Sequence, residues 1–324
     1  MSITSGLRRS ALALIAACVL CAHAAAQTWP DKPIKLIVNF PPGGVADMLA
    51  RAISPGVSEA IKQPVIVENR PGANGAIGAD TVAKAPADGY TFLVTSGGAM
   101  TVDPFIYSNL PYDTQKDLTP VASLAIVRVF LMVHPSVPAK NLNEFVAYAR
   151  ANPGKLSYGS AGSGSSPHIA AEMFKRAARI DATHVPYKGA APALNDLLGG
   201  QVQFMFDPGP GLQHAATGKL TVLAVASAKR ASRYPDVPTL EELGMHVDAD
   251  TTFGVYAPAG VSTAIVERMN RDITRTLNSP ALVDNMARLG GEVAPMTIQE
   301  FVSRQAADRA RYGVFIKEAG IKVD

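Results

Sequence analysis

Two loops rich in glycine, serine and proline carry the residue types best suited to binding an anion. The first lies in Phe40–Asp47 and the second in Gly159–His168, and each separates a strand-like apolar run from a helical pattern. Backbone N–H groups at the start of a helix attract anions such as carboxylates, and glycine lets a ligand approach the backbone closely. The two loops together therefore predict carboxylate binding, although an ordinary strand-to-helix turn would explain either one alone.

The second loop resembles two catalytic motifs but lacks the decisive residue of each. Gly159 and Gly164 have the glycine spacing of a phosphate-binding loop, yet Ser165 stands where that motif needs lysine. No serine in the loop has glycine both two residues before and two residues after it, as a nucleophile elbow requires. Attack by a serine is therefore not expected. Pro167 suits the first position of a helix, which predicts Ser166 as the N-cap.

His168 follows this loop and is the residue that most suggests acid–base catalysis. No Asp or Glu is placed by sequence spacing to orient its ring, so a hydrogen bond to a ligand, or to a residue that itself contacts the ligand, is the favoured role. The sequence has no HExxH motif and no cluster of His and carboxylate residues with the spacing of metal ligands. Neither a metal nor another cofactor is predicted.

Two acidic residues are candidates for a ligand contact. Asp47 falls in the first turn of a predicted helix, where a negative charge complements the helix dipole, so a structural role is favoured over contact with a ligand amine. Asp207 directly follows the predicted strand Val202–Phe206, and the carboxyl ends of strands face the ligand crevice in α/β proteins. A turn-forming role before Pro208 is equally consistent with its position.

Strand-like runs alternate with helical patterns, which predicts an α/β fold with a largely parallel sheet. The first unit is a strand at Ile34–Phe40 and a helix from Val45 to about Lys62, with a kink or break expected at Ser54-Pro55 because proline lacks the N–H of a helix interior. Further strands are expected at Val65–Glu68, Tyr90–Thr95, Val121–Val127, Val129–Val133, Leu156–Gly159, Thr183–Pro186, Val202–Phe206, Leu220–Ala226 and Phe253–Ala257. Further helices are expected at Leu142–Ala151, Pro167–Ala178, Ala190–Leu198, Leu212–Thr217, Ser262–Leu277, Ala281–Leu289 and Thr297–Glu318.

Residues 1–26 have the pattern of a secretion signal. Arg8 and Arg9 form a basic segment, Ala11–Ala22 is an apolar run too short to span a bilayer, and Ala24-Ala25-Ala26 fits the small-residue cleavage rule. Export to a bacterial periplasm, with Gln27 as the first mature residue, is therefore predicted.

Both cysteines, Cys18 and Cys21, lie in this same segment, so the mature protein is expected to have no disulfide. The alternative for this segment is a lipoprotein signal, because Ile15-Ala16-Ala17-Cys18 resembles one and would leave Cys18 lipidated.

The charge balance argues against a nucleic-acid partner. Arg8 and Arg9 fall in the secretion signal, so 28 of the 30 Lys and Arg residues remain against 27 Asp and Glu. A nucleic-acid-binding protein would need a basic stripe. No later apolar run approaches the roughly 20 residues of a membrane helix.

Several segments, taken in order, resemble the Bug family, also called the TctC-type receptors. These are extracytoplasmic solute receptors of tripartite tricarboxylate transporters. The segments are WPDKPIKLIVNFPPGGVAD, VIVENRPGANGAIGAD, ADGYTFL, GSAGSGSSPHIAAEMF, VPYKGAAPALNDLLGGQVQFMFD, GKLTVLAVASAKRASRYPDVPTLEELG and FGVYAPAGV, spread over nearly all of Trp29–Asp324. The resemblance implies a periplasmic binding protein of the type II fold, with two α/β domains and a ligand cleft between them. It also implies that a small carboxylate is bound mainly through backbone groups and ordered water.

The resemblance places the ligand-binding residues in three loops and on the opposite wall of the cleft. They are Phe40, Pro42, Gly43, Gly44, Val45, Ala46, Asp47, Ser96, Gly97, Gly98, Ala99, Ser160, Ala161, Gly162, Ser163, Gly164, Ser165, Ser166, His168 and Asp207. The chain departs from the family pattern at Asp103 (usually Asn), at Pro167 within Ser-Pro-His, at Pro208, and at Thr251-Thr252, where tryptophan often precedes the phenylalanine. These departures leave the ligand open.

By the same resemblance, the first domain comprises residues 27–126 and 251–324, and the second comprises residues 127–250. The hinges are expected near Leu124–Arg128 and Asp248–Thr252. Closure of such domains around a ligand is a standard switch.

The expected function is a monomeric periplasmic receptor that captures a small carboxylate, delivers it to membrane transporter subunits and catalyses nothing. The alternatives are a ligand-sensing subunit for a signalling partner and an exported hydrolase that uses His168. Di- and tricarboxylates, amino acids and aromatic acids all stay open as ligands. Aromatic residues make up only 6% of the chain, which tilts the expectation toward an aliphatic acid.

Overall fold

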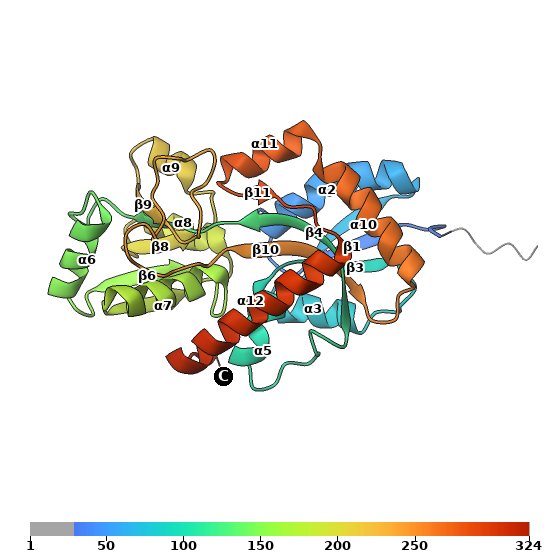
Figure 1. Ribbon diagram of the computed structural model, residues 1–324, viewed down its shortest axis with the longest axis horizontal. Coiled ribbons are helices and arrows are strands. Elements are labelled where there is room, and N and C mark those ends of the chain that lie inside the picture. The colour runs from blue at the N-terminus through green and yellow to red at the C-terminus, as the bar shows by residue number, and fades with distance from the viewer. Residues whose placement is uncertain (1–28, 324) are drawn as a thin grey trace, which may run out of the picture.

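The computed structural model describes residues 29–323, and it contains two α/β units that lie side by side (Figure 1). The first unit is built on a six-stranded sheet of order β11-β4-β10-β3-β1-β2, and the second on a five-stranded sheet of order β7-β6-β8-β5-β9. The secretion signal predicted for residues 1–26 lies outside the described residues. Within residues 29–323, no helix has the length and apolar character needed to cross a bilayer.

The sheet of the first unit is mixed rather than largely parallel. Its strands are β1 (Ile34–Val38), β2 (Val65–Asn69), β3 (Thr91–Ser96), β4 (Leu118–Val127), β10 (Thr251–Pro258) and β11 (Glu292–Val293). β1 runs parallel to β2 and β3, whereas β10 is antiparallel to both β3 and β4. The prediction of a largely parallel sheet was therefore wrong, because the chain returns from the second unit and inserts β10 between two strands of the first.

Helices cover both faces of this sheet. One face packs against α2 (Val45–Ile61), α10 (Thr263–Leu277) and α11 (Pro280–Arg288). The other face packs against α3 (Ala76–Ala83) and α12 (Ile298–Ala319), with the short η1 (Ala73–Gly75), α4 (Gly98–Thr101) and α5 (Asp103–Ile106) nearby. Apolar residues recur along α2 at helical spacing, so its buried face contributes to the core of the first unit.

The helix does not break at Ser54-Pro55, because α2 continues through Pro55 to Ile61, and a kink there stays a prediction. Pro55 lacks the N–H that would bond to the Arg51 carbonyl one turn earlier. The Ser54 hydroxyl donates 2.6 Å to a different carbonyl, that of Ala50. Burial of the apolar face on both sides of Pro55 outweighs the local cost of the proline.

The sheet of the second unit is also mixed. Its strands are β5 (Phe130–Val133), β6 (Leu156–Ser160), β7 (Ala182–Pro186), β8 (Phe204–Asp207) and β9 (Thr221–Val225). β6 is parallel to β7 and β8, and β5 is antiparallel to β8 and β9. The helices α6 (Leu142–Ala151) and α7 (Ser166–Ala178) cover one face, and α8 (Ala190–Leu198) and α9 (Leu212–Ala216) cover the other.

Several predicted boundaries in the second unit shift by one or two residues, and two of these shifts concern candidate site residues. Ser165, not Ser166, is the N-cap of α7, because Ser165 has extended backbone angles while Ser166 is already helical. The strand predicted at Val202–Phe206 runs from Phe204 to Asp207, so Asp207 is the last strand residue rather than the first loop residue.

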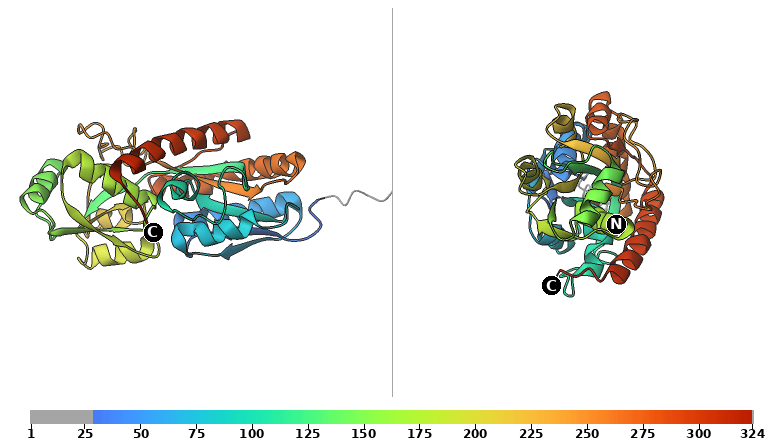
Figure 2. Two further views of the ribbon diagram at one scale, coloured as in Figure 1. Left: turned by 90° about the horizontal axis from the view of Figure 1, so that it is seen from below. Right: turned by 90° about the vertical axis from the view of Figure 1, so that its left-hand side faces the viewer.

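The chain crosses between the units twice, and α12 spans them (Figure 2). β4 ends at Val127 in the first sheet and β5 begins at Phe130 in the second, while β10 returns the chain to the first sheet. Near its C-terminal end, α12 contacts the second unit through an Arg176–Glu318 ion pair of 3.2 Å. Its Tyr312 hydroxyl also donates 3.1 Å to the Asp250 carbonyl of the returning segment.

Candidate ligand-binding site

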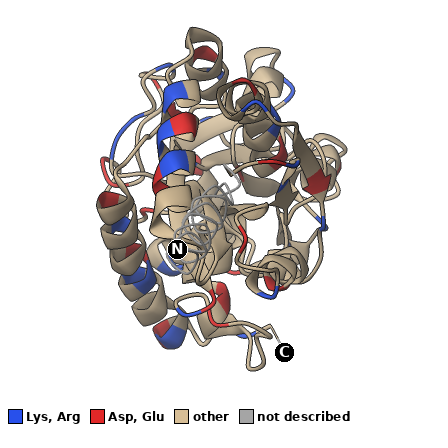
Figure 3. Ribbon diagram, turned by 90° about the vertical axis from the view of Figure 1, so that its right-hand side faces the viewer, with Lys and Arg blue, Asp and Glu red and all other residues tan. Residues whose placement is uncertain are grey.

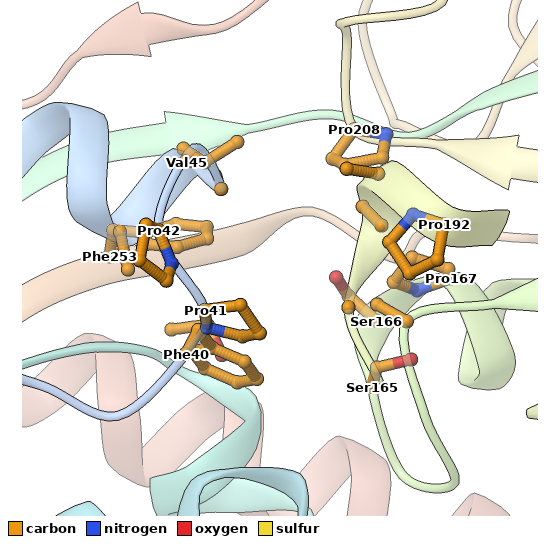
Figure 4. A pocket seen from close by; sticks show the side chains of 17 residues that line it. Phe40, Pro41, Pro42, Val45, Ser165, Ser166, Pro167, Pro192, Pro208 and Phe253 are labelled. Atoms are coloured by element: carbon orange, nitrogen blue, oxygen red, sulfur yellow. The ribbon is translucent and has the colours of Figure 1, made fainter. Parts of the chain in front are cut away.

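A cavity lies between the two units, at the ends of the loops that the sequence singled out. Including its open mouth, it has a volume of about 700 Å³, within the range typical of small-molecule sites. Its lining from the first unit is Phe40, Pro41, Pro42, Gly44, Val45, Ala46, Ser96 and Phe253. Its lining from the second unit is Ala161, Ser165, Ser166, Pro167, Gly189, Ala190, Ala191, Pro192 and Pro208. Figure 4 shows these two walls facing each other.

Three helices begin at this cavity, and their N-caps are Gly44 for α2, Ser165 for α7 and Gly189 for α8. None of the three N-caps uses a side chain to accept a hydrogen bond from its own helix. Glycine has no side chain to do so, and the Ser165 hydroxyl donates instead to the Gly162 carbonyl at 2.6 Å. The backbone N–H groups in the first turns of these three helices therefore lack the side-chain acceptor that usually caps a helix N-terminus.

The backbone donors of these first turns are free. Within residues 29–323, the N–H groups of Val45, Ala46, Ser166, Ala190 and Ala191 make no hydrogen bond. Each helix N-terminus also carries the positive end of the helix dipole. One wall contributes α2 and the other contributes α7 and α8, so an anion in the cavity can accept hydrogen bonds from both units at once.

The loop before α2 is held by an ionic network centred on Asp47. The Asp47 carboxylate accepts hydrogen bonds from the Gly43 N–H at 3.0 Å, from Arg51 Nε at 3.0 Å and from Asn69 Nδ2 at 2.9 Å. The same Asn69 amide also donates 3.1 Å to the Phe40 carbonyl. Burial opposes ionisation most strongly, but the hydrogen bonds together hold the pKa of Asp47 below its ordinary value. Asp47 is thus an ionised support behind the cavity lining.

The loop before α7 is held by two neutral histidines, the buried His168 and the half-buried His184. His168 Nδ1 accepts the Gly164 N–H at 3.0 Å, and the His168 ring stacks on His184 with centroids 4.0 Å apart. His184 Nε2 lies 2.7 Å from the Ser160 hydroxyl. Burial lowers the pKa of His168 to about 4, and burial together with the neighbouring His168 lowers the pKa of His184 to about 3.

This arrangement gives His168 a defined task in the loop. An imidazole nitrogen that accepts an N–H must be unprotonated, which agrees with the lowered pKa of His168. Its ring is buried and does not line the cavity. The geometry therefore gives His168 no place from which to act on a bound molecule as an acid or base.

Asp207 holds the loop that follows β8. Its Oδ1 accepts the N–H groups of Gly209 and Gly211, each at 2.8 Å. Its Oδ2 is buried and makes no hydrogen bond within the described chain. Burial raises the pKa of Asp207 to about 6. Asp207 does not line the cavity, but the next residue, Pro208, does.

The predicted ligand residues divide into those that line the cavity and those that lie elsewhere. The lining residues among them are Phe40, Pro42, Gly44, Val45, Ala46, Ser96, Ala161, Ser165 and Ser166. The others are Gly43, Asp47, Gly97, Gly98, Ala99, Ser160, Gly162, Ser163, Gly164, His168 and Asp207. Of these, Gly97 and Gly98 line a smaller neighbouring pocket together with Ser166.

Sequence reasoning missed part of the second wall. Its residues Gly189, Ala190, Ala191 and Pro192 form the start of α8, which the sequence predicted as a helix without connecting it to the site. The sequence did contain a pattern that could have predicted this part of the site, because strand β7, Gly189 and α8 repeat the strand–glycine–helix pattern of the other two loops.

Among residues 29–323, no charged side chain lines the cavity, so its positive potential comes from the backbone. On the side of the molecule seen in Figure 3, positively charged Lys and Arg are interspersed with negatively charged Asp and Glu. Residues 29–323 contain no group of His, Cys, Asp or Glu that could hold a metal ion.

Comparison with known proteins fits this geometry. A model of the tripartite tricarboxylate transporter family receptors, TctC, matches residues 49–321. The chain belongs to the TctC family. A TctC protein is a periplasmic solute-binding receptor and not an enzyme.

Individual TctC relatives match over almost their whole length. Protein BugT of Bordetella pertussis is 35% identical over 312 residues, which cover 95% of this chain and 96% of BugT. An R. palustris protein solved with adipate is 36% identical, with a TM-score of 0.87 and coverage of 91% of this chain and 99% of that one. MatC from Rhodopseudomonas palustris, solved with bound malate, is 30% identical, with a TM-score of 0.82 and coverage of 88% and 99%.

Proposed function

We propose that this TctC receptor captures a small carboxylate in the cavity between its two units and delivers it to the membrane subunits of a tripartite transporter. The observation that carries the proposal is the convergence of three uncapped helix N-termini on one cavity without a charged side chain. The adipate and malate bound to two similar proteins support the same class of ligand.

The ligand carboxylate accepts N–H groups from α2 on one wall and from α7 or α8 on the other. Charge-assisted hydrogen bonds of this kind are the stronger ones, and they gain strength when water is excluded. A ligand that bonds to both walls favours the closed arrangement of the units over an open one.

The domains proposed for this motion are residues 27–126 with 251–324, and residues 127–250. The assignment of strands to the two sheets supports this division. The proposed hinges, Leu124–Arg128 and Asp248–Thr252, coincide with the places where the chain passes from one sheet to the other.

The proposed binding residues fall into two groups with different tasks. Val45, Ala46 and Ser166 present backbone donors to the ligand, together with Ala190 and Ala191 of α8. Three of the other predicted residues, Asp47, His168 and Asp207, hold the loops that aim those donors.

The exported form that we propose begins at Gln27 after cleavage behind Ala26, and it acts as a monomer in the periplasm. The TctC assignment supports the compartment. Lipidation of Cys18 is the alternative for the leader.

The proposal is tested by titrating the purified chain with carboxylic acids and with their amides in a calorimeter. We expect an acid to bind and its amide to fail, because a neutral amide loses the charge-assisted hydrogen bonds. The Ala190→Pro variant removes one N–H from the first turn of α8, a position where helices tolerate proline. It should weaken binding by roughly tenfold or more, whereas the matched Ala190→Ser variant, which keeps the N–H, should not.

Two results would contradict this function. Equal binding of acids and amides would show that the helix N-termini do not recognise a negative charge. Failure of every acid to bind to protein that had been unfolded to release any ligand carried through purification, and then refolded, would exclude carboxylates as the solute class.

A further inference from the structure

Apart from its backbone donors, the cavity is lined almost entirely by hydrocarbon. The first wall presents the rings of Phe40 and Phe253 together with Pro41, Pro42 and Val45, and the second presents Pro167, Pro192 and Pro208 (Figure 4). The only side-chain polar groups on the lining are the hydroxyls of three serines.

These serines offer few hydrogen bonds to a ligand body. The Ser165 hydroxyl is already engaged with the Gly162 carbonyl at 2.6 Å. Ser166 is the first residue of α7, so its hydroxyl lies beside the donors that take the carboxylate. Ser96 ends β3 on the opposite wall. Beyond these groups, a polar substituent on the ligand would face proline and phenylalanine carbons.

The acidic residues around the cavity are not placed to receive a ligand ammonium group. The carboxylate of Asp47 is occupied by Gly43, Arg51 and Asn69 behind the lining. Asp207 is fully buried and does not line the cavity, whereas the next residue, Pro208, does. A bound amino acid would therefore bury its ammonium group without a counter-charge, which is strongly unfavourable.

We propose that this cavity selects acids with an unsubstituted hydrocarbon body, aliphatic or aromatic, over hydroxy acids and amino acids, and that Pro192, Pro208 and Phe253 set this selectivity. The inference rests on the proposed carboxylate function and narrows its ligand class. Burying a hydroxyl that finds no partner weakens binding by about ten- to a hundredfold relative to the unsubstituted acid.

The test uses trios of acids that share one carbon skeleton, titrated into the refolded full-length mature chain. Succinate is compared with malate and aspartate, glutarate with 2-hydroxyglutarate and glutamate, and 3-phenylpropanoate with phenyllactate and phenylalanine. In any trio that binds, the unsubstituted acid should bind at least about tenfold more tightly than the other two members.

Variants at Pro208 then test whether the lining causes this preference. Pro208→Ser places a hydroxyl on the wall. It should reduce the ratio of the affinity for the unsubstituted acid to the affinity for the hydroxy acid by at least threefold. Pro208→Ala removes the ring without adding a polar group. It should therefore weaken binding of the unsubstituted acid and should not strengthen binding of the hydroxy acid. Circular dichroism establishes that both variants are folded before the titrations.

The outcomes separate this inference from the function on which it rests. Binding of malate, glutamate or phenyllactate as tightly as their parent acids would overturn the selectivity while leaving the carboxylate receptor intact. Absence of binding by all nine acids, or equal binding of acids and amides, would instead remove the proposed function. Identical affinity ratios for Pro208→Ser and Pro208→Ala would exclude Pro208 as a determinant of the selectivity for unsubstituted acids.

Discussion

The loop before α2 rests on charged side chains, whereas the loop before α7 rests on neutral ones. Asp47 joins Gly43 of its own loop to Arg51 and Asn69, and the Arg51 side chain is about half exposed. In the other loop, Gly164 donates to the buried His168, which stacks on His184. Both loops nevertheless present the same kind of uncapped helix N-terminus to the cavity.

The difference shows that one binding feature can be built on two kinds of support with different sensitivities. Gly43 is exposed, and a Cβ placed there would have no atom within 4 Å. Gly164 is buried, and a Cβ there would collide with the Cδ1 atom of Ile106 from the first unit. The α2 loop is therefore maintained by partly buried polar bonds to Asp47, and the α7 loop by close packing between the units.

The largest expected effect comes from Gly164→Val. Gly164 has a φ of +84° and would meet both Ile106 and Asn74 through its new side chain. We expect a loss of about 3 kcal/mol of unfolding free energy and no measurable ligand binding. Urea denaturation should show a smaller loss of about 1 to 2 kcal/mol for Gly43→Val, which has a φ of +81° but open space around it. Equal losses of unfolding free energy in the two variants would contradict the proposed difference in packing between the α2 loop and the α7 loop.

The next effect is expected from Asp47→Ala. This change removes the acceptor shared by Gly43, Arg51 and Asn69, and it should lower the unfolding free energy by about 2 kcal/mol and weaken ligand binding. Asp47→Asn keeps one oxygen for the Gly43 N–H and is the matched control, with a smaller loss. If Asp47→Ala bound ligand as well as the unmodified protein, the ionic network would not support the donors of α2.

A third prediction uses pH to distinguish Asp47, which supports the α2 loop, from His168, which supports the α7 loop. The pKa of His168 is about 4 in the folded protein and about 6.5 in an unfolded chain, so the unfolded state takes up the proton first as the pH falls. Stability should therefore decrease between about pH 6.5 and pH 4. Asp47, with its lowered pKa, contributes stability that begins to be lost only when the pH falls into the range where ordinary carboxylates titrate, and that is lost fully below the pKa of Asp47 in the folded protein.

His168→Asn provides the matched comparison, because an amide oxygen can still accept the Gly164 N–H but does not titrate. Between pH 7 and pH 5, the unmodified protein should lose about 1 to 2 kcal/mol more unfolding free energy than the variant. Burial raises the pKa values of Asp103 and Asp207, so these groups act in the opposite direction, but they do so in both proteins. Parallel pH curves would show that His168 does not titrate across the unfolding transition.

Local sequence patterns predicted the parts of the site that are built from neighbouring residues. The strand–glycine–helix units before α2 and α7 follow from apolar runs, glycines and helical spacing within about 20 residues of sequence. The structural role favoured for Asp47 follows likewise from its place in the first helical turn. The sequence could not predict that Asn69, from β2, completes its network.

The rest of the site depends on contacts between distant segments. His184 lies 16 residues after His168 and stacks on it only because β6 and β7 pair in parallel. Phe253 reaches the cavity because β10 inserts between β3 and β4, a topology that no local pattern reveals. The low overall aromatic content likewise said nothing about where Phe40 and Phe253 would meet.

The smallest effect is expected from Ser163→Ala, within the same loop as Gly164. The Ser163 side chain is half-buried and its hydroxyl makes no hydrogen bond within the described residues, so stability should change by less than about 0.5 kcal/mol and ligand affinity should be unaltered. Ser165→Ala is the matched control, because it removes the 2.6 Å hydrogen bond to the Gly162 carbonyl and should cost about 1 kcal/mol. If calorimetry showed equal affinity losses for Ser163→Ala and Gly164→Val, side-chain hydroxyls rather than backbone geometry would govern recognition at α7.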